Sequence, residues 1–249
     1  GANSVASNTV VGVNALDANT TGDSNTAVGG NALTENTTAS NNTAIGYQAL
    51  KVNTTGGNNT AVGQNSMDAN TTGANNVAVG INALGGNTTA DNNTAVGKDA
   101  LLANTTGTQN VALGVQSLDA NTTGTRNTAL GSFSLSALTT GNYNVAVGKG
   151  SLEATTTSDY NVACGYEALA LNSTGTQNVA VGGLALDAIT TNSYNTAVGH
   201  AALSSNTATG GTAVGHRALT GNTTGIENTA VGSLALDSVT TNSYNTAVG

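Results

Sequence analysis

The sequence predicts an all-β chain folded as a parallel β-solenoid, and two observations lead to this class. First, a glycine that ends each copy of the motif Asn-Thr-Ala-Val-Gly recurs every 17 residues, except for one step of 16 near Thr209. Second, small and apolar residues keep fixed places relative to this marker glycine, whereas other places vary freely. Each copy has room for one or two short strands and two turns, which is one coil of a stack. The marker glycines are Gly12, Gly29, Gly46, Gly63, Gly80, Gly97, Gly114, Gly131, Gly148, Gly165, Gly182, Gly199, Gly215, Gly232 and Gly249.

The repeat fills almost the whole chain, so we expect residues 1–249 to form a single repeat domain of about fourteen coils. Ser4-Val5-Ala6 resemble the worn end of an earlier copy, and the chain stops at Asn-Thr-Ala-Val-Gly. We therefore expect a segment of something longer.

Composition argues against an ordinary globular domain. The chain has no Trp or Pro, and aromatic residues make up 3% of it, so it cannot build a thick core of large side chains. Disorder is the first alternative, but charged residues are only 7% and the period is strict, which favours an ordered stack. The net charge of −8 with 5 Lys and Arg excludes a basic surface for nucleic acid or membranes. A run of apolar residues long enough to span a bilayer is absent from the sequence.

The triplet before each marker glycine, as in Thr26-Ala27-Val28, is the predicted strand. Its first and third residues share one face because side chains alternate along a strand. The central Ala is held in almost every copy, which indicates that another backbone comes close to it. We expect the Thr and Val face to pack on the chain's own coil and the Ala face to meet a neighbouring chain. Cys164 stands where Val usually stands, so a small buried apolar residue is the expected role.

The residue four places after the marker is Leu in every copy except one, which has Met67. This Leu is the predicted large core residue of each coil, and its burial contributes roughly 1.5–3 kcal/mol. A short helical turn around Ala-Leu is the competing local interpretation, which the Thr-rich and Gly-rich flanks disfavour.

The first residue of the next segment, Asn-Thr-Thr-Gly, is usually Asn but becomes Leu138, Ile189 and Val239 in three copies. A solvent position would not usually make that exchange, so we predict an inward Asn that forms a stacked amide ladder. The same three copies carry a Tyr five residues later, which suggests that the apolar residue and the Tyr pack together. The Gly at the end of the segment, such as Gly22 and Gly56, suits a turn with positive φ. The three Tyr residues are Tyr143, Tyr194 and Tyr244.

The position directly after the marker varies, so we expect it to face outward. His200 and His216 occupy it in adjacent coils, but a metal pair would want a third ligand, and two solvated histidines are expected instead. Scattered acids share another position, where a solvated face is expected rather than a calcium loop. We predict no catalytic, cofactor-binding or metal-binding residue, and no enzyme. The acids are Asp17, Asp68, Asp119, Glu153, Asp187 and Asp237.

The string Asn-[Thr/Val]-Ala-[Val/Ile/Leu]-Gly, as in residues 110–114 and 144–148, resembles the head repeat of YadA-like trimeric autotransporter adhesins. The longer form, NTAVGxxALxxNTTG, resembles repeats of phage tail fibres and related bacterial fibre and adhesin proteins. This resemblance implies a left-handed parallel β-roll with three chains around one axis. It also implies an extracellular location, on a virion fibre or a bacterial cell surface. The coil here is longer than that of the adhesin head, in the Leu and Asn-Thr-Thr part.

Three functions follow as hypotheses. The first is a structural and adhesive segment of a homotrimeric fibre that extends a receptor-binding tip or itself contacts a host or cell-surface glycan, without nucleic acid and without membrane insertion. The second is ice binding by ranks of Thr pairs such as Thr20-Thr21, although only one Thr of each pair could face ice. The third, a glycan-cleaving fibre, needs paired carboxylates at a defined separation, and the sparse acids give it little support.

Overall fold

The structure is a computed structural model that describes residues 7–249 and divides into two compact units. Unit 1 ends at Arg126, and unit 2 runs from Asn127 to Gly249. Residues 7–249 contain three-residue strands joined by turns and no helix, and they make about fourteen turns. The predicted all-β solenoid class is confirmed. The suggested worn copy at Ser4-Val5-Ala6 lies outside the described residues.

Every predicted strand triplet is a strand. Those of unit 1 are β1 (Thr9–Val11), β2 (Thr26–Val28), β3 (Thr43–Ile45), β4 (Thr60–Val62), β5 (Val77–Val79), β6 (Thr94–Val96) and β7 (Val111–Leu113). Those of unit 2 are β8 (Thr128–Leu130), β9 (Val145–Val147), β10 (Val162–Cys164), β11 (Val179–Val181), β12 (Thr196–Val198), β13 (Thr212–Val214), β14 (Thr229–Val231) and β15 (Thr246–Val248).

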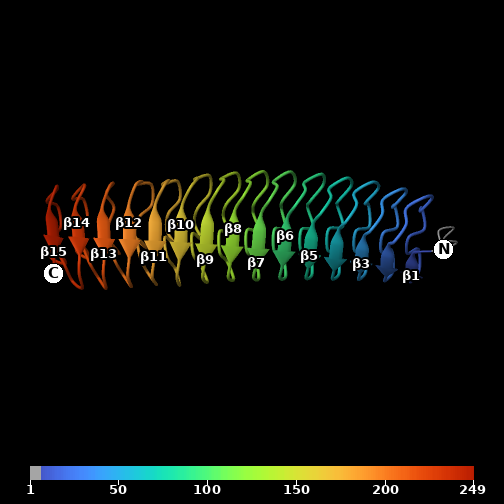
Figure 1. The fold of residues 1–249 in the computed structure, drawn as a ribbon, viewed down its shortest axis with the longest axis horizontal. Helices are drawn as coiled ribbons and strands as arrows, with labels where there is room; N and C mark the ends of the chain where they lie inside the picture. The colour runs from blue at the N-terminus through green and yellow to red at the C-terminus, as the bar shows by residue number, and fades with distance from the viewer. Residues whose placement is uncertain (1–6) are drawn as a thin grey trace. The chain divides into compact units, whose positions relative to one another are not determined.

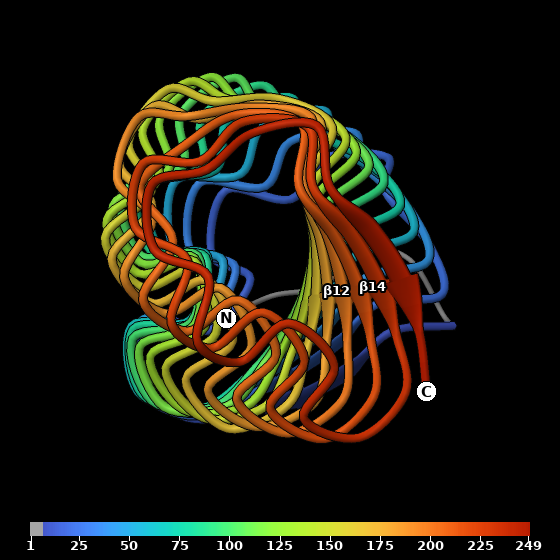
Figure 2. The same ribbon diagram turned by 90° about the vertical axis from the view of Figure 1, so that its left-hand side faces the viewer.

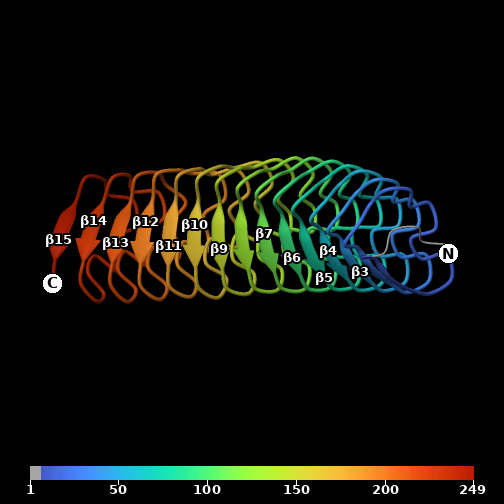
Figure 3. The same ribbon diagram turned by 45° about the vertical axis from the view of Figure 1, so that its right-hand side comes forward.

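Within each unit, consecutive strands pair in parallel and in register (Figure 1). In unit 1, for example, Ala27 lies opposite Ala44, one copy further along the chain. The short 16-residue step keeps the same register, because Ala197 of β12 lies opposite Ala213 of β13. The missing residue is absorbed in the turn after Asn206, whose side chain donates to the carbonyl of Ala208, two residues on, instead of three. Figure 3 shows how the turns repeat from coil to coil inside each unit.

The strand faces point the opposite way from the prediction. The central Ala of each strand from Ala27 to Ala230 is fully buried within the single chain, whereas the first and third residues are exposed or half-buried. Each strand forms one side of its coil, and the turns close the other sides (Figure 2). The central Ala faces the interior of the chain's own coil, where Leu and Asn side chains are also buried, and this explains its small size. The Ala rank is therefore not an interface with another chain.

The predicted core residue is confirmed, but its backbone is unexpected. Leu33, Met67 and Leu101 are fully buried and have φ values of 51°, 48° and 51°, in the left-handed region. Asn31, two residues before Leu33, is also left-handed, with a φ of 57°. These left-handed residues exclude a right-handed helical turn at this place. The conformation costs roughly 1–2 kcal/mol per residue, a cost that burial of the Leu side chain offsets.

Glycine is required for different reasons at the marker position and at the end of the Asn-Thr-Thr-Gly segment. The marker Gly97 has a φ of +136°, and a Cβ there would lie 2.4 Å from the carbonyl oxygen of Gly114. The turn predicted at the marker is confirmed, and only glycine fits it. The predicted positive φ at the second glycine is wrong, because Gly56 is absent from the left-handed region. Glycine is needed there because the backbone of the next coil comes too close for a side chain. A Cβ at Gly56 would lie 2.2 Å from the carbonyl oxygen of Gly73.

The predicted amide ladder is confirmed in unit 1. Asn36, Asn53 and Asn70 are fully buried, and each Nδ2 donates to Oδ1 of the equivalent Asn one coil earlier, with 3.1, 3.1 and 2.8 Å between the two atoms. In two coils of unit 2 the fully buried Leu138 and Ile189 take this place, whereas Asn222 still donates to Asn206 at 2.7 Å. The ring of Tyr143 stacks on that of Tyr160, with 4.9 Å between centroids, and packing of the Tyr on the apolar residue stays a prediction.

A second ladder of asparagines directly before the strands was not predicted. The Oδ1 of Asn25 accepts the backbone N–H of Asn42 at 2.9 Å, and Nδ2 of Asn42 donates to the carbonyl of Gly56 at 3.0 Å. Each such Asn ties a strand start to the turn of the next coil. Its presence in almost every copy of the motif was the available signal.

Candidate functional site: the outer strand face

The outer strand face is the surface formed, in each unit, by the first and third residues of the strands. The first residues are Thr or Val, and the third are Val, Ile, Leu or Cys. Away from the chain ends, about half of the third residues keep nearly two fifths of their surface exposed, as Val79 (37%), Leu113 (38%) and Val231 (39%) illustrate, and the others are half-buried. Each unit thus presents a regular, uncharged and largely apolar sheet face to its surroundings.

Cys164 belongs to this face. It is the third residue of β10, and its free thiol is exposed. The prediction of a buried Cys164 is wrong because the two faces of the strand were assigned the wrong way round. The thiol is consequently a natural probe for anything that covers the outer strand face.

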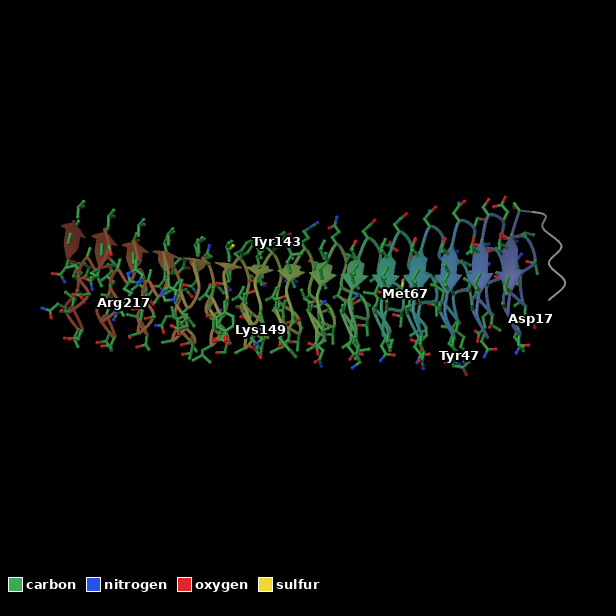
Figure 4. The ribbon with its side chains drawn as sticks, turned by 90° about the horizontal axis from the view of Figure 1, so that it is seen from below. Asp17, Tyr47, Met67, Tyr143, Lys149 and Arg217 are labelled. Atoms are coloured by element: carbon green, nitrogen blue, oxygen red, sulfur yellow. The ribbon has the colours of Figure 1, made fainter. Side chains whose placement is uncertain are left out.

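The position after the marker faces outward, as predicted. Tyr47 and Tyr166 are about half exposed there. Lys149 stands at the same position, and Figure 4 shows it on a different side of unit 2 from Tyr143, which belongs to another part of its coil. His200 and His216 are exposed and stack, with 5.8 Å between ring centroids. Within residues 7–249, no group of three or more His, Cys, Asp or Glu side chains is arranged to hold a metal ion.

The position shared by the acids is less solvated than predicted. Asp68, Asp119 and Asp187 are half-buried, and this burial raises the pKa of each carboxyl above its ordinary value, although hydrogen bonds from backbone N–H groups act in the opposite direction. One oxygen of Asp119 and one of Asp187 are buried without a hydrogen-bond partner. Asp17, Glu153 and Asp237, at the same position, are exposed as expected.

Unit 2 also contains a surface hollow of about 610 Å³ that sequence reasoning missed. Glu153, Glu167 and Asp187 line it together with small and apolar side chains. Glu153 and Asp187 belong to the shared acid position, whereas Glu167 comes from a different part of its coil. Ser136, Glu153, Ala170 and Asp187 stand at a position that varies from coil to coil, so the repeat pattern itself could not reveal the hollow.

The paired threonines divide their roles. The hydroxyl of Thr54, the first of its pair, donates to the carbonyl of Thr71 in the next coil at 3.0 Å. The second threonine, as at Thr55 and Thr72, is exposed. One exposed Thr rank per unit results, as the alternation of side chains predicted, and in unit 2 the buried Ala208 interrupts it.

No protein-family model matches the chain, and no curated protein matches it either. The resemblance to trimeric adhesin heads and phage fibres therefore stays a prediction from the motif. In the part of the chain that the structure describes, no helix is long and apolar enough to cross a membrane.

Proposed function

We propose that this chain is a structural and adhesive segment of an extracellular homotrimeric fibre, on a virion or a bacterial surface, and not an enzyme. The observation that carries the proposal is the outer strand face. Antiparallel sheets can leave one face to water, but parallel sheets are ordinarily covered on both faces. A contiguous apolar surface of this kind is typical of an interface.

The occupant that we propose for the outer strand face is further copies of the same chain. The face repeats with every coil, so a partner that covers all of it must repeat with the same spacing, roughly 4.8 Å per coil. A second copy of this chain has the same repeat spacing, because its coils are the same. The face also carries no charge, so the net charge of −8 does not oppose contact there. Three chains around one axis are what the resemblance implies, and closed rotational symmetry lets each chain bury the same face.

Sedimentation equilibrium of residues 1–249 tests the proposal. We expect a mass near three chains for the natural sequence and a mass near one chain for the double variant V79D/V181D, which puts a carboxylate on the outer strand face of each unit. The matched control is I81D/V115D, because Ile81 and Val115 are also exposed apolar residues but follow the marker glycine. Circular dichroism checks that all three proteins fold. A single-chain mass for the natural sequence overturns the trimer, and equal dissociation of the control overturns the interface.

Ice binding is the second candidate, and the exposed rank of second threonines favours it. In unit 1 this rank includes Thr38, Thr55 and Thr72, each one coil apart. A thermal hysteresis assay on the same protein separates the two functions. Hysteresis that disappears in the variant T38A/T55A/T72A supports ice binding, whereas no hysteresis at any concentration eliminates it.

A further inference from the structure

The hollow in unit 2 is lined by residues five places after the marker glycine, the position that the acids share in other coils. Ala170 stands there, between Glu153 of the preceding coil and Asp187 of the following one. In unit 1 the same position is occupied by Leu102 in one coil. Ala137, Ala154 and Leu171 complete the apolar part of the lining, and the cavity measures about 610 Å³. Volumes of a few hundred Å³ are typical of sites for small molecules.

Three carboxylates stand around this apolar lining without a matching cation. Glu153 and Glu167 approach each other beside Gly150, since a Cβ built there would lie 3.0 Å from Oε2 of Glu153 and 3.3 Å from Cγ of Glu167. Asp187 is the third. Within residues 7–249, none of the three is paired with Lys or Arg, and the ion pair that the structure records joins Lys98 to Asp99 in unit 1.

Lys149, the lysine nearest in sequence to Glu153, forms no ion pair with these carboxylates. The ammonium of Lys149 lies over the ring of Tyr166, 5.6 Å from its centroid, in a cation–π contact. The carboxylate of Glu167 lies close enough to Tyr166 to raise the pKa of its hydroxyl. The hollow therefore combines an apolar lining with three acidic side chains that form no ion pair with any described residue.

We propose that this hollow binds an aliphatic polyamine. The alkyl segments lie on Ala154, Ala170 and Leu171, and the ammonium groups donate charge-assisted hydrogen bonds to the three carboxylates. Glu153 and Asp187 occupy the same position two coils apart, roughly 10 Å along the stack. A flexible chain with several ammonium groups spans that distance, whereas a single small cation does not.

Other ligand classes fit the lining less well. A divalent metal ion needs several oxygen ligands around one point, and no such group of carboxylates occurs among residues 7–249. A neutral sugar is usually held against an aromatic ring face. The lining is instead aliphatic, since it consists of Ala and Leu beside Ser136 and the three acids.

Isothermal titration of residues 1–249 with spermidine, in near-physiological salt, tests the proposal. We expect saturable binding to the natural sequence. The variant A170L fills the hollow without changing any charge, and Leu102 shows that the fold accepts Leu at this position. We expect A170L, and separately E153Q/E167Q/D187N, to weaken binding by roughly tenfold or more.

The matched control is D17N/E35Q/D237N, which removes three exposed acids outside the hollow and changes the net charge equally. Its affinity for spermidine should stay within about twofold of the natural value, since isolated surface charges contribute little. The proposal is overturned if spermidine does not bind, if A170L binds like the natural protein, or if the control loses affinity as much as the hollow variants. It is also overturned if equimolar Mg²⁺ displaces spermidine, because the attraction would then depend on charge alone.

Discussion

Nδ2 of the buried Asn70 donates to Oδ1 of Asn53, 2.8 Å away in the preceding coil. The same nitrogen donates to the carbonyl of Gly73 at 3.0 Å, and Oδ1 of Asn70 accepts from Nδ2 of Asn87 at 2.7 Å. One side chain thereby connects three consecutive coils and closes its own turn. Ladders of this kind hold the coils together in place of a large apolar core, which this chain cannot form because it has few large apolar side chains.

Replacing Asn70 by Ala should destabilise the chain by roughly 2–4 kcal/mol, because the carbonyl of Gly73 and the amide groups of two neighbours lose a buried partner. The measurement is urea unfolding followed by circular dichroism. The matched control is T72A, which truncates an exposed side chain in the same turn. Equal losses for N70A and T72A would contradict an energetic role for the ladder.

Replacing either of two adjacent glycines in unit 2 by Ala should change the stability of the chain by very different amounts. Gly182 has a φ of +134°, and a Cβ there would lie 2.5 Å from the carbonyl of Gly199. Gly183 has an ordinary φ, and its nearest contact would be 3.6 Å, to His200. We expect G182A to cost at least about 3 kcal/mol, since strain and overlap add, and G183A to change stability by about 0.5 kcal/mol or less. Thermal unfolding of the two variants measures the difference, and similar midpoints would refute this account of the marker glycine.

The half-buried acids should make the folded chain more stable in mildly acidic solution than at neutral pH. Burial raises the pKa of Asp68, Asp119 and Asp187 above the ordinary value of 3.8, so the folded state binds protons more tightly than the unfolded state. Their destabilising effect is present above the raised pKa and is lost as the pH falls through it. Asp99 acts in the opposite direction, because a hydrogen bond from Lys98 lowers its pKa, and that contribution disappears near and below 3.8.

Urea unfolding between neutral pH and the ordinary carboxyl value measures this dependence. The variant D68N/D119N/D187N should be more stable than the natural chain at neutral pH and should show a flatter profile. The control is D17N/D237N, because both residues occupy the same position but are exposed. A profile that is identical in the natural chain and the triple variant would rule out these three acids as its cause.

The thiol of Cys164 should report assembly directly. In the proposed trimer the outer strand face is covered, so an aromatic disulfide reagent should react at least about tenfold more slowly than in the V79D/V181D variant, where the face is open. Complete reaction of both proteins in urea controls for the amount of thiol. Fast reaction of the natural protein under conditions where its mass equals three chains would mean that the interface lies elsewhere.

Sequence reasoning succeeded where a position is constrained in the same way in every coil. The strand triplets, the buried Leu and the inward Asn could be predicted, because periodic identity reports a periodic environment. The exchange of Asn for Leu138 and Ile189 was decisive, since only a buried position accepts both. The orientation of the strand was not decidable in this way, because a small residue such as Ala27 fits equally well against a partner chain or inside its own coil.

Other features depend on backbone conformation and three-dimensional packing, which residue identities alone do not specify. A left-handed backbone at Leu101 was unexpected, since Leu has no preference for it. It follows from the tight turn between the marker glycine and the next segment. The hollow around Ala170 was missed for a different reason, because that position varies from coil to coil and side chains from several coils line the hollow.

The coil that is one residue short has a consequence for how such a chain changes over generations. Strands β12 and β13 keep their register although a residue is missing between them, so single-residue losses are tolerated in the turns. Each coil contacts only its neighbours, so an unequal crossover between two copies in the gene would delete or duplicate whole coils and leave the surviving contacts intact. Length is therefore a quantity that recombination can adjust in steps of one coil, without redesigning any contact.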